Sequence, residues 1–282
     1  MTFELRDIAF AYKGKASTGR AVVNRLNLSA GLGECVGVIG QEGAGKTTLL
    51  QLMNGLLKPD QGTVRIDGTD IWQCPDSISG FRQRIGFAFQ FPEQQFFCET
   101  IRDELLYASV NFGDGLLSGG PTPEQALALV GLHASKFLSR SPFTLSMGEA
   151  RRVALAIVLM AQPRALLLDE PTAGLDGKGI DFVVNLLRRM KDQQVTTVLV
   201  SHDVDVLAEV ASRVIVLEEG EVRHDLPVEE ILINRELLGA YGYELPEIVR
   251  FMSEYGKRNG GVERRLYTVN EARALPGFGR TP

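Results

Sequence analysis

The sequence has few of the features that mark disulfide-rich or zinc-binding proteins. It contains only three cysteines in 282 residues, Cys35, Cys74 and Cys98. They lie far apart and show no Cys-X-X-Cys spacing, so neither a disulfide framework nor a zinc site is indicated. We expect three free thiols in a reducing compartment.

Long apolar runs are also missing. The stretch VALAIVLMA at residues 153–161 falls well short of the ~18 residues that a membrane-spanning helix needs. The first ten residues, MTFELRDIAF, carry charges where a signal peptide requires an apolar segment. We therefore expect a protein that neither crosses a membrane nor is exported by such a signal, although it can still lie against a membrane surface.

The chain has no excess of positive charge. Its formal net charge is -5, which provides no basic field for nucleic acid, so we expect no nucleic-acid partner. With 44% hydrophobic and 23% charged residues, it has the composition of a globular protein that buries a core. Its length suits one large domain, or one domain with an appendage.

The order of apolar patterns predicts the α/β fold class. The first third is rich in strand patterns, residues 91–160 are mainly helical, and strands then alternate with helices as a right-handed parallel sheet requires. We expect a mostly parallel sheet with an N-terminal antiparallel β subdomain. The predicted domain covers residues 1–225 with a helical insertion at about 91–160, and residues 226–282 form a C-terminal helical extension.

A glycine-rich segment, GQEGAGKTT, follows the apolar strand pattern ECVGVIG and precedes a helical pattern. It matches G-x-x-x-x-G-K-[ST], the phosphate-binding loop of P-loop NTPases, in the context that this motif requires. Glycines let successive backbone N–H groups turn toward an anion, the lysine reaches the β- and γ-phosphates, and the first threonine binds Mg²⁺. The residues assigned to nucleotide binding are Gly40, Gly43, Gly45, Lys46, Thr47 and Thr48.

The complementary carboxylates occur in RALLLDEP, residues 164–171. An apolar strand brings Asp169 to its carboxyl end, where ligands bind in open α/β sheets. We expect Asp169 to hold the water shell of Mg²⁺. Glu170, one residue further, is placed to accept a proton from the attacking water.

With these motifs in place, the chain resembles the ATP-binding subunits of ABC transporters over roughly residues 3–225. LSMGE resembles the signature loop LSGGQ, AGLD resembles the D-loop, and SHD supplies the switch histidine. Absence of an N-K-x-D motif makes a P-loop kinase or GTPase the weaker interpretation. The residues that the resemblance adds to the site are Tyr12, Gln90, Ser146, Gly148, Asp176 and His202.

The resemblance implies a head-to-tail dimer that closes on ATP. Each phosphate loop would then face the signature loop of the partner, Ser146 and Gly148 in this chain, with Asp176 bridging the interface. Tyr12 would stack on adenine, and Gln90 would sense the γ-phosphate and Mg²⁺. His202 would bond to the γ-phosphate and orient the water with Glu170.

The segment FQFPEQQFFCETIRDEL and the tail YGYELPEIVRFMSEYGKR resemble the energy-coupling factor, or CbiO-type, group. That group implies a homodimer, or a heterodimer with a related ATPase, on the cytoplasmic face of the membrane. It works beneath a transmembrane coupling protein and a substrate-binding membrane protein, and takes up vitamins or transition-metal ions. Gln95 and Phe96 are candidates for contact with the coupling protein, and the C-terminal helices for dimer contacts.

Two departures stand in the signature loop, where Met147 replaces glycine and Glu149 replaces glutamine. Ser146 and Glu149 have the spacing of a capping box for the following helix. We expect Met147 to hinder closure on the partner's nucleotide. The alternative function is that of a soluble ABC-type ATPase in DNA repair or translation, although the acidic chain lacks the coiled coils and basic surfaces of such proteins.

Overall fold

The computed structural model describes residues 1–13, 21–73, 75–91, 95–111 and 120–258. Two sheets organise this part of the chain: an antiparallel sheet of order β2-β1-β4-β5 and a six-stranded sheet of order β10-β9-β3-β8-β7-β6. In the second sheet β9, β3, β8, β7 and β6 run parallel, and only β10 is antiparallel to its neighbour. The predicted fold class is confirmed.

The strands are β1 (Phe3–Phe10), β2 (Val23–Ala30), β3 (Cys35–Ile39), β4 (Gln61–Ile66), β5 (Thr69–Asp70), β6 (Ile85–Ala88), β7 (Ala165–Asp169), β8 (Thr196–Val200), β9 (Arg213–Glu218) and β10 (Glu221–Pro227). The helices are α1 (Lys46–Met53), α2 (Pro75–Gln83), α3 (Ile101–Asn111), α4 (Pro123–Leu129), α5 (Ala134–Phe137), α6 (Met147–Met160), α7 (Gly177–Asp192), α8 (Val204–Val210), α9 (Val228–Leu232), α10 (Arg235–Ala240) and α11 (Glu247–Arg258).

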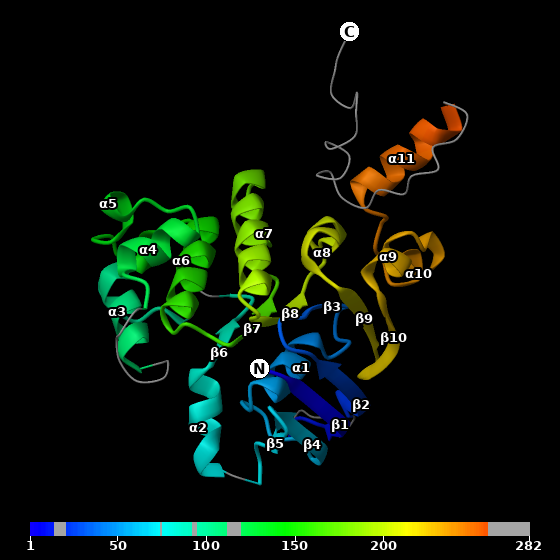
Figure 1. Cartoon of the computed structure of the whole chain (residues 1–282), viewed down its shortest axis with the longest axis horizontal. Helices are drawn as coiled ribbons and strands as arrows, with labels where there is room; N and C mark the ends of the chain where they lie inside the picture. Colours follow the sequence, from blue (N-terminus) through cyan, green and yellow to red (C-terminus); the bar gives the residue numbers. More distant parts are fainter. Residues whose placement is uncertain (14–20, 74, 92–94, 112–119, 259–282) are drawn as a thin grey trace.

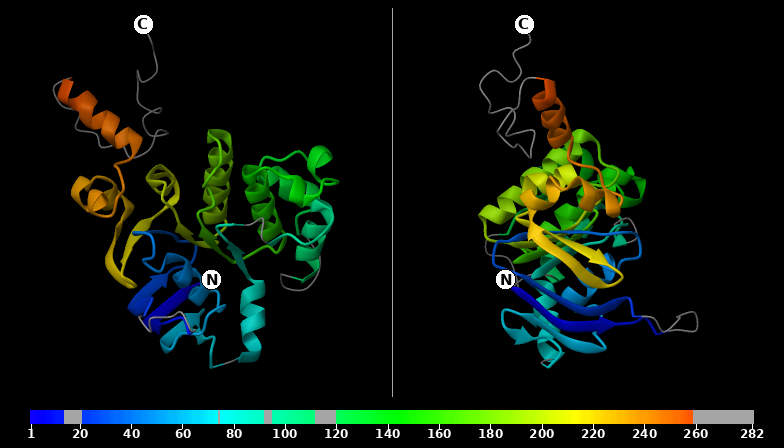
Figure 2. Two further views of the ribbon diagram at one scale, coloured as in Figure 1. Left: turned by 180° about the vertical axis from the view of Figure 1, so that it is seen from behind. Right: turned by 90° about the vertical axis from the view of Figure 1, so that its right-hand side faces the viewer.

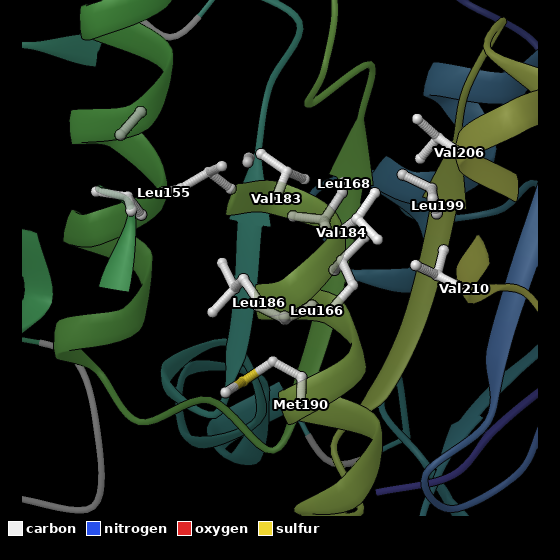
Figure 3. Close-up of a cluster of buried hydrophobic side chains, with 14 of the residues drawn as sticks. Leu155, Leu166, Leu168, Val183, Val184, Leu186, Met190, Leu199, Val206 and Val210 are labelled. Atoms are coloured by element: carbon white, nitrogen blue, oxygen red, sulfur yellow. The ribbon is translucent and has the colours of Figure 1, made fainter. Parts of the chain in front are cut away.

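The parallel sheet is covered on both faces, as its continuous apolar strands require. Because side chains alternate along a strand, Val198 and Val200 of β8 pack toward α1 and the antiparallel sheet, whereas Leu199 packs toward the opposite helical layer. Helices α6, α7 and α8 form that layer (Figures 1 and 2). Figure 3 shows α7 residues Val183 and Leu186 against the leucines of β7.

This layering brings the polar ends of the parallel strands to one edge. The loops after β3, β6, β7 and β8 carry, in order, the phosphate loop, Gln90, Glu170 and His202. The carboxyl edge of an open α/β sheet is where its ligands bind. The order β3-β8-β7-β6 therefore gathers the predicted site.

Some elements differ from the sequence prediction. RVIVLEEGEV reads as one strand, but Glu219 and Gly220 have positive φ angles of 47° and 80°, which turn the chain into the β9–β10 hairpin. Helix α2 and strand β6 follow the β4–β5 hairpin in a segment whose short mixed pattern predicted neither.

The C-terminal region packs onto the core. The predicted boundary at residue 225 falls inside β10, and the helices beyond it begin at Val228. Ile231, Leu238 and Tyr243 are buried in the same apolar cluster as the α7–α8 layer. Residues 259–282 of the predicted extension lie outside the described residues. Within the described part, none of the helices has the length and apolar character needed to span a membrane.

Candidate active site

The phosphate loop connects β3 to α1 through three glycines with positive φ. At Gly40 a side chain is impossible, because a Cβ would meet the carbonyl oxygen of Leu217 at 2.1 Å. At Gly43 the φ angle is 79° and nothing lies within 4 Å of a Cβ position, so here the backbone conformation rather than a steric limit favours glycine. Gly45, at φ 100°, directly precedes α1, and its loop presents N–H groups together with the positive end of the helix.

Lys46 is folded onto its own loop. Its Nζ donates to the carbonyl oxygens of Gly40 at 2.7 Å and Gln41 at 2.9 Å. Burial lowers the pKa of Lys46, while the nearby carboxylates of Glu170 and Asp169 act in the opposite direction. The ammonium group is therefore held at the loop by carbonyl acceptors that a phosphate oxygen can replace.

Thr47 and Asp169 meet across the site. The Thr47 hydroxyl donates to Asp169 Oδ2 at 2.6 Å, and burial raises the pKa of Asp169. A hydroxyl and a carboxylate are hard oxygen donors of the kind that Mg²⁺ binds. Because these two oxygens already face each other, both can face one ion, and the residues fit the predicted metal.

Glu170 turns sharply away from β7. Its φ angle is 52°, a conformation that costs a non-glycine residue about 1–3 kcal/mol, and its backbone N–H is held by the carbonyl of Val200 at 3.0 Å. The side chain is 8% exposed. Burial raises its pKa to about 7, with the neighbouring Asp169 adding to the effect. A carboxylate with this pKa suits a general base near neutral pH.

His202 lies beside that carboxylate. Its backbone N–H donates to Glu170 Oε2 at 3.2 Å, and its Nε2 is 3.4 Å from Glu170 Oε1. Burial and the Lys46 charge lower the pKa of His202. The lowered pKa favours the neutral imidazole, and the His202 side chain is 58% exposed.

The remaining predicted residues surround this centre. The Tyr12 hydroxyl lies 3.1 Å from Thr48 Oγ1, and the residue is 47% exposed. Thr48 is buried beneath it. Asp176 is the N-cap of α7 and accepts the Gly179 N–H at 2.8 Å. The predicted nucleotide contacts of these residues stay predictions.

The sequence of residues 23–173, more than half of the chain, matches the ABC transporter family. The chain belongs to that family. An ATP-hydrolysing cassette is the shared unit of the family, so the chain is an ABC ATPase.

Relatives place it in the energy-coupling factor group. An energy-coupling factor transporter ATP-binding protein EcfA2 from Symbiobacterium thermophilum is 41% identical over 85% of the chain and 83% of the relative. EcfA2 from Bacillus licheniformis is 36% identical over 96% and 95%, and EcfA2 from Clostridium perfringens 33% over 97% and 96%.

Solved structures agree with this placement. The structure of cbiO1 from Clostridium perfringens, described as part of the ABC transporter complex cbiONQ, has a TM-score of 0.68 and 29% identity over 89% of this chain and 98% of that one. An ATP-binding cassette solved as a dimer in a post-hydrolysis state with ADP and Pi has a TM-score of 0.70 and 29% identity, over 80% and 98%.

The signature loop of this ABC ATPase begins α6. Ser146 accepts the Glu149 N–H at 3.3 Å, and Glu149 Oε2 accepts the Ser146 N–H at 2.9 Å, so the predicted capping box is confirmed. These hydrogen bonds lower the pKa of Glu149. Met147 is 61% exposed, and a Cβ on Gly174 of the D-loop would lie 3.2 Å from its sulfur. Within this chain the signature loop is therefore in contact with the D-loop. Met147 lies at the contact, and Gly148 is the next residue of the signature loop.

Two side chains that matter to the ATPase site were not singled out from sequence. Arg151 of α6 donates to the Gln90 carbonyl at 2.5 Å, which fixes the backbone of Gln90 while its side chain stays exposed. Tyr243 places its hydroxyl 3.1 Å from His202 Nδ1. No motif in the sequence points to either residue. The arginine is one of an Arg-Arg pair, and the tyrosine is 41 residues from the histidine.

Proposed function

We propose that the chain is one of two ATPase subunits of an energy-coupling factor importer, and that it powers the uptake of a vitamin or a transition-metal ion. The observation that carries this is the buried Glu170 carboxylate, with its pKa near 7, beside His202 and next to Thr47 and Asp169. In the proposed reaction this cluster supplies a base, an imidazole for the γ-phosphate and a metal-binding pair at one edge of the sheet. The energy-coupling factor names of the relatives support transport over DNA repair or translation.

In the proposed reaction, water attacks the γ-phosphorus of ATP, and the bond to the β–γ bridging oxygen breaks with departure of ADP. Glu170 accepts the proton of the attacking water. Lys46 moves from the loop carbonyls to the β- and γ-phosphate oxygens, and His202 donates from Nε2 to a γ-phosphate oxygen. Mg²⁺, when bound, neutralises phosphate charge, and Thr47, Asp169 and Gln90 are the residues that would hold it.

The helical insertion supplies the proposed contact with the transmembrane coupling protein. Phe97 is 60% exposed, and its ring meets that of Tyr107 edge-on at 4.8 Å between centroids. Tyr107 belongs to helix α3, and Leu106 and Val110 of that helix are exposed as well. Exposed apolar groups of this kind mark interaction sites. Of the two residues predicted for this role, Gln95 is exposed, but Phe96 is buried in the helical core, so we assign its part to Phe97.

We place the protein at the cytoplasmic face of the membrane, held by these contacts, and as a head-to-tail dimer with a copy of itself or a related ATPase. In that dimer the signature loop completes the partner's site. Helix α11 is the proposed additional dimer element: its Ile248 is buried, whereas Phe251 is 48% exposed.

The test is purification of the tagged chain from detergent-solubilised membranes of its own host, followed by identification of the bound subunits. We expect two membrane proteins, and uptake of their substrate that stops with Lys46→Ala. Phe97→Ser should release the membrane subunits, and Leu32→Ser is the matched control, since Leu32 is 58% exposed and lies between β2 and β3 rather than beside α3. Recovery of the chain with nucleic acid or ribosomes instead would contradict the proposal.

A further inference from the structure

One hydroxyl group from the C-terminal region joins two parts of the ATPase site. Tyr243, between α10 and α11, is 8% exposed. Its hydroxyl oxygen lies 3.1 Å from the Gly40 nitrogen, 3.0 Å from the Gly40 oxygen and 3.1 Å from His202 Nδ1. The tyrosine ring also stacks on the imidazole, with centroids 5.7 Å apart and an interplanar angle of 13°. The first glycine of the phosphate loop and the switch histidine therefore share one partner.

The single proton of the Tyr243 hydroxyl has two possible acceptors. A tyrosine hydroxyl has a single proton to donate and two lone pairs. It accepts the Gly40 N–H, and it can donate to the Gly40 carbonyl or to His202 Nδ1. The Gly40 carbonyl already accepts from Lys46 Nζ at 2.7 Å. Because that carbonyl has a donor in Lys46, donation of the tyrosine proton to Nδ1 leaves neither acceptor without a donor.

The second ring nitrogen of His202, Nε2, decides where the imidazole proton lies. Nε2 of His202 faces the Glu170 carboxylate at 3.4 Å, and a carboxylate accepts hydrogen bonds but does not donate them when ionised. A proton on Nε2 satisfies that contact, and the hydroxyl of Tyr243 satisfies the lone pair on Nδ1. The tautomer of a histidine is set by the bond at its second nitrogen.

We propose that Tyr243 is a positioning residue for ATP hydrolysis, which fixes His202 in the Nε2–H tautomer and holds its ring beside Glu170. The inference rests on the proposed role of His202 in hydrolysis. It makes the region after β10 part of the ATPase site.

A second contact ties the same region to the loop and helix after β8. The Glu247 N–H at the start of α11 donates to Asp205 Oδ1 at 2.9 Å. Asp203 in turn caps α8 through the N–H groups of Asp205 and Val206. Between these contacts lies a cavity of about 620 Å³ with His202 and Tyr243 in its wall. The C-terminal region therefore contacts the segment after β8 at both Asp205 and His202.

The first experiment compares steady-state ATP hydrolysis by the intact complex with wild-type chain, Tyr243→Phe and Tyr241→Phe. Loss of one hydrogen bond that orients a reacting group corresponds to roughly a 5- to 10-fold fall in kcat. The KM for ATP should stay within about 2-fold, because the loop N–H groups that follow Gly40 are not bonded to the tyrosine. Tyr241 lines the same cavity, and its hydroxyl should not matter. Unchanged kcat in Tyr243→Phe, or an equal fall in both variants, would overturn the proposal.

A double-mutant cycle shows whether the tyrosine acts through the histidine. In a His202→Ala background, Tyr243→Phe should change kcat by less than about 2-fold, because its target is gone. The same 5- to 10-fold fall in both backgrounds would overturn the proposal. If His202→Ala alone leaves hydrolysis unchanged, the proposed function of His202 fails as well; if it slows hydrolysis while Tyr243→Phe does not, only the present inference fails.

The wild-type protein provides a test that does not depend on the folding of a variant. The chain has three histidines, so ¹⁵N-histidine NMR can resolve His202, with His202→Gln for assignment. We expect a neutral ring protonated at Nε2 with a hydrogen-bonded Nδ1, and a mixed tautomer population in Tyr243→Phe. A ring protonated at Nδ1 in the wild-type protein would overturn the proposal.

Discussion

Glu170→Gln separates the effect of the Glu170 charge on folding from its effect on hydrolysis. Burial raises the pKa of Glu170 from 4.5 to about 7, so folding disfavours the ionised carboxylate. The stability that comes from the neutral form is complete below pH 4.5 and is lost as the pH rises through about 7. This displacement corresponds to about 3 kcal/mol. Glutamine keeps the shape and stays neutral, so the variant should be more stable than the wild-type chain by up to that amount at pH 8.5.

The assay is thermal unfolding without nucleotide or Mg²⁺ at pH 5 and pH 8.5. For a chain of this size, about 3 kcal/mol corresponds to roughly 5–10 °C in Tm, and the difference should shrink to about a quarter of that at pH 5. Glu149→Gln is the matched control, and its Tm change should have the opposite sign. Hydrogen bonds lower the pKa of Glu149, so loss of the Glu149 carboxylate charge should destabilise the chain at pH 8.5. An equal Tm difference for Glu170→Gln at both pH values would show that ionisation of Glu170 does not destabilise the folded chain.

The same variant has a kinetic consequence. Without a proton acceptor at this position, hydrolysis at this site should fall by roughly 10²–10⁴-fold, while ATP binding, measured by titration, remains. Near-normal turnover would remove Glu170 from the role of base.

The remaining predictions concern three other parts of the chain. Lys46→Ala should lose ATP affinity itself, since its ammonium group is replaced by nothing that can contact the phosphates; a titration that matches wild type would contradict this. Met147→Gly should speed ATP hydrolysis by removing the side chain packed against Gly174, and equal rates would show that Met147 is tolerated. Removal of the chain after Leu245 should leave a folded ATPase with weaker subunit association by light scattering, whereas removal after Leu226 should also unfold it, because Leu238 is fully buried in the core.

The elements that bind phosphate were predictable because each has a local cause. The phosphate loop needs glycines at fixed positions before a lysine, and the strand before Asp169 is apolar throughout. Each of these patterns lies within about ten consecutive residues, so a single sequence is enough to predict the element. The capping box at Ser146 and Glu149 is local in the same way, and the structure confirms it.

The contacts between distant segments were not predictable from one sequence. Phe96 and Phe97 are adjacent aromatic residues, and only the packing of the helical insertion decides that the first is buried and the second exposed. Likewise, YGYELP shows a turn, but the position of Tyr243 over Gly40 depends on α9 and α10 packing against the parallel sheet.

The most direct test of the central claim is an experimental structure of the Glu170→Gln protein with ATP and Mg²⁺. We expect the γ-phosphate between Lys46 and His202, with the metal ion at Thr47 and Asp169. Nucleotide bound elsewhere, or a metal ion away from Thr47 and Asp169, would contradict it.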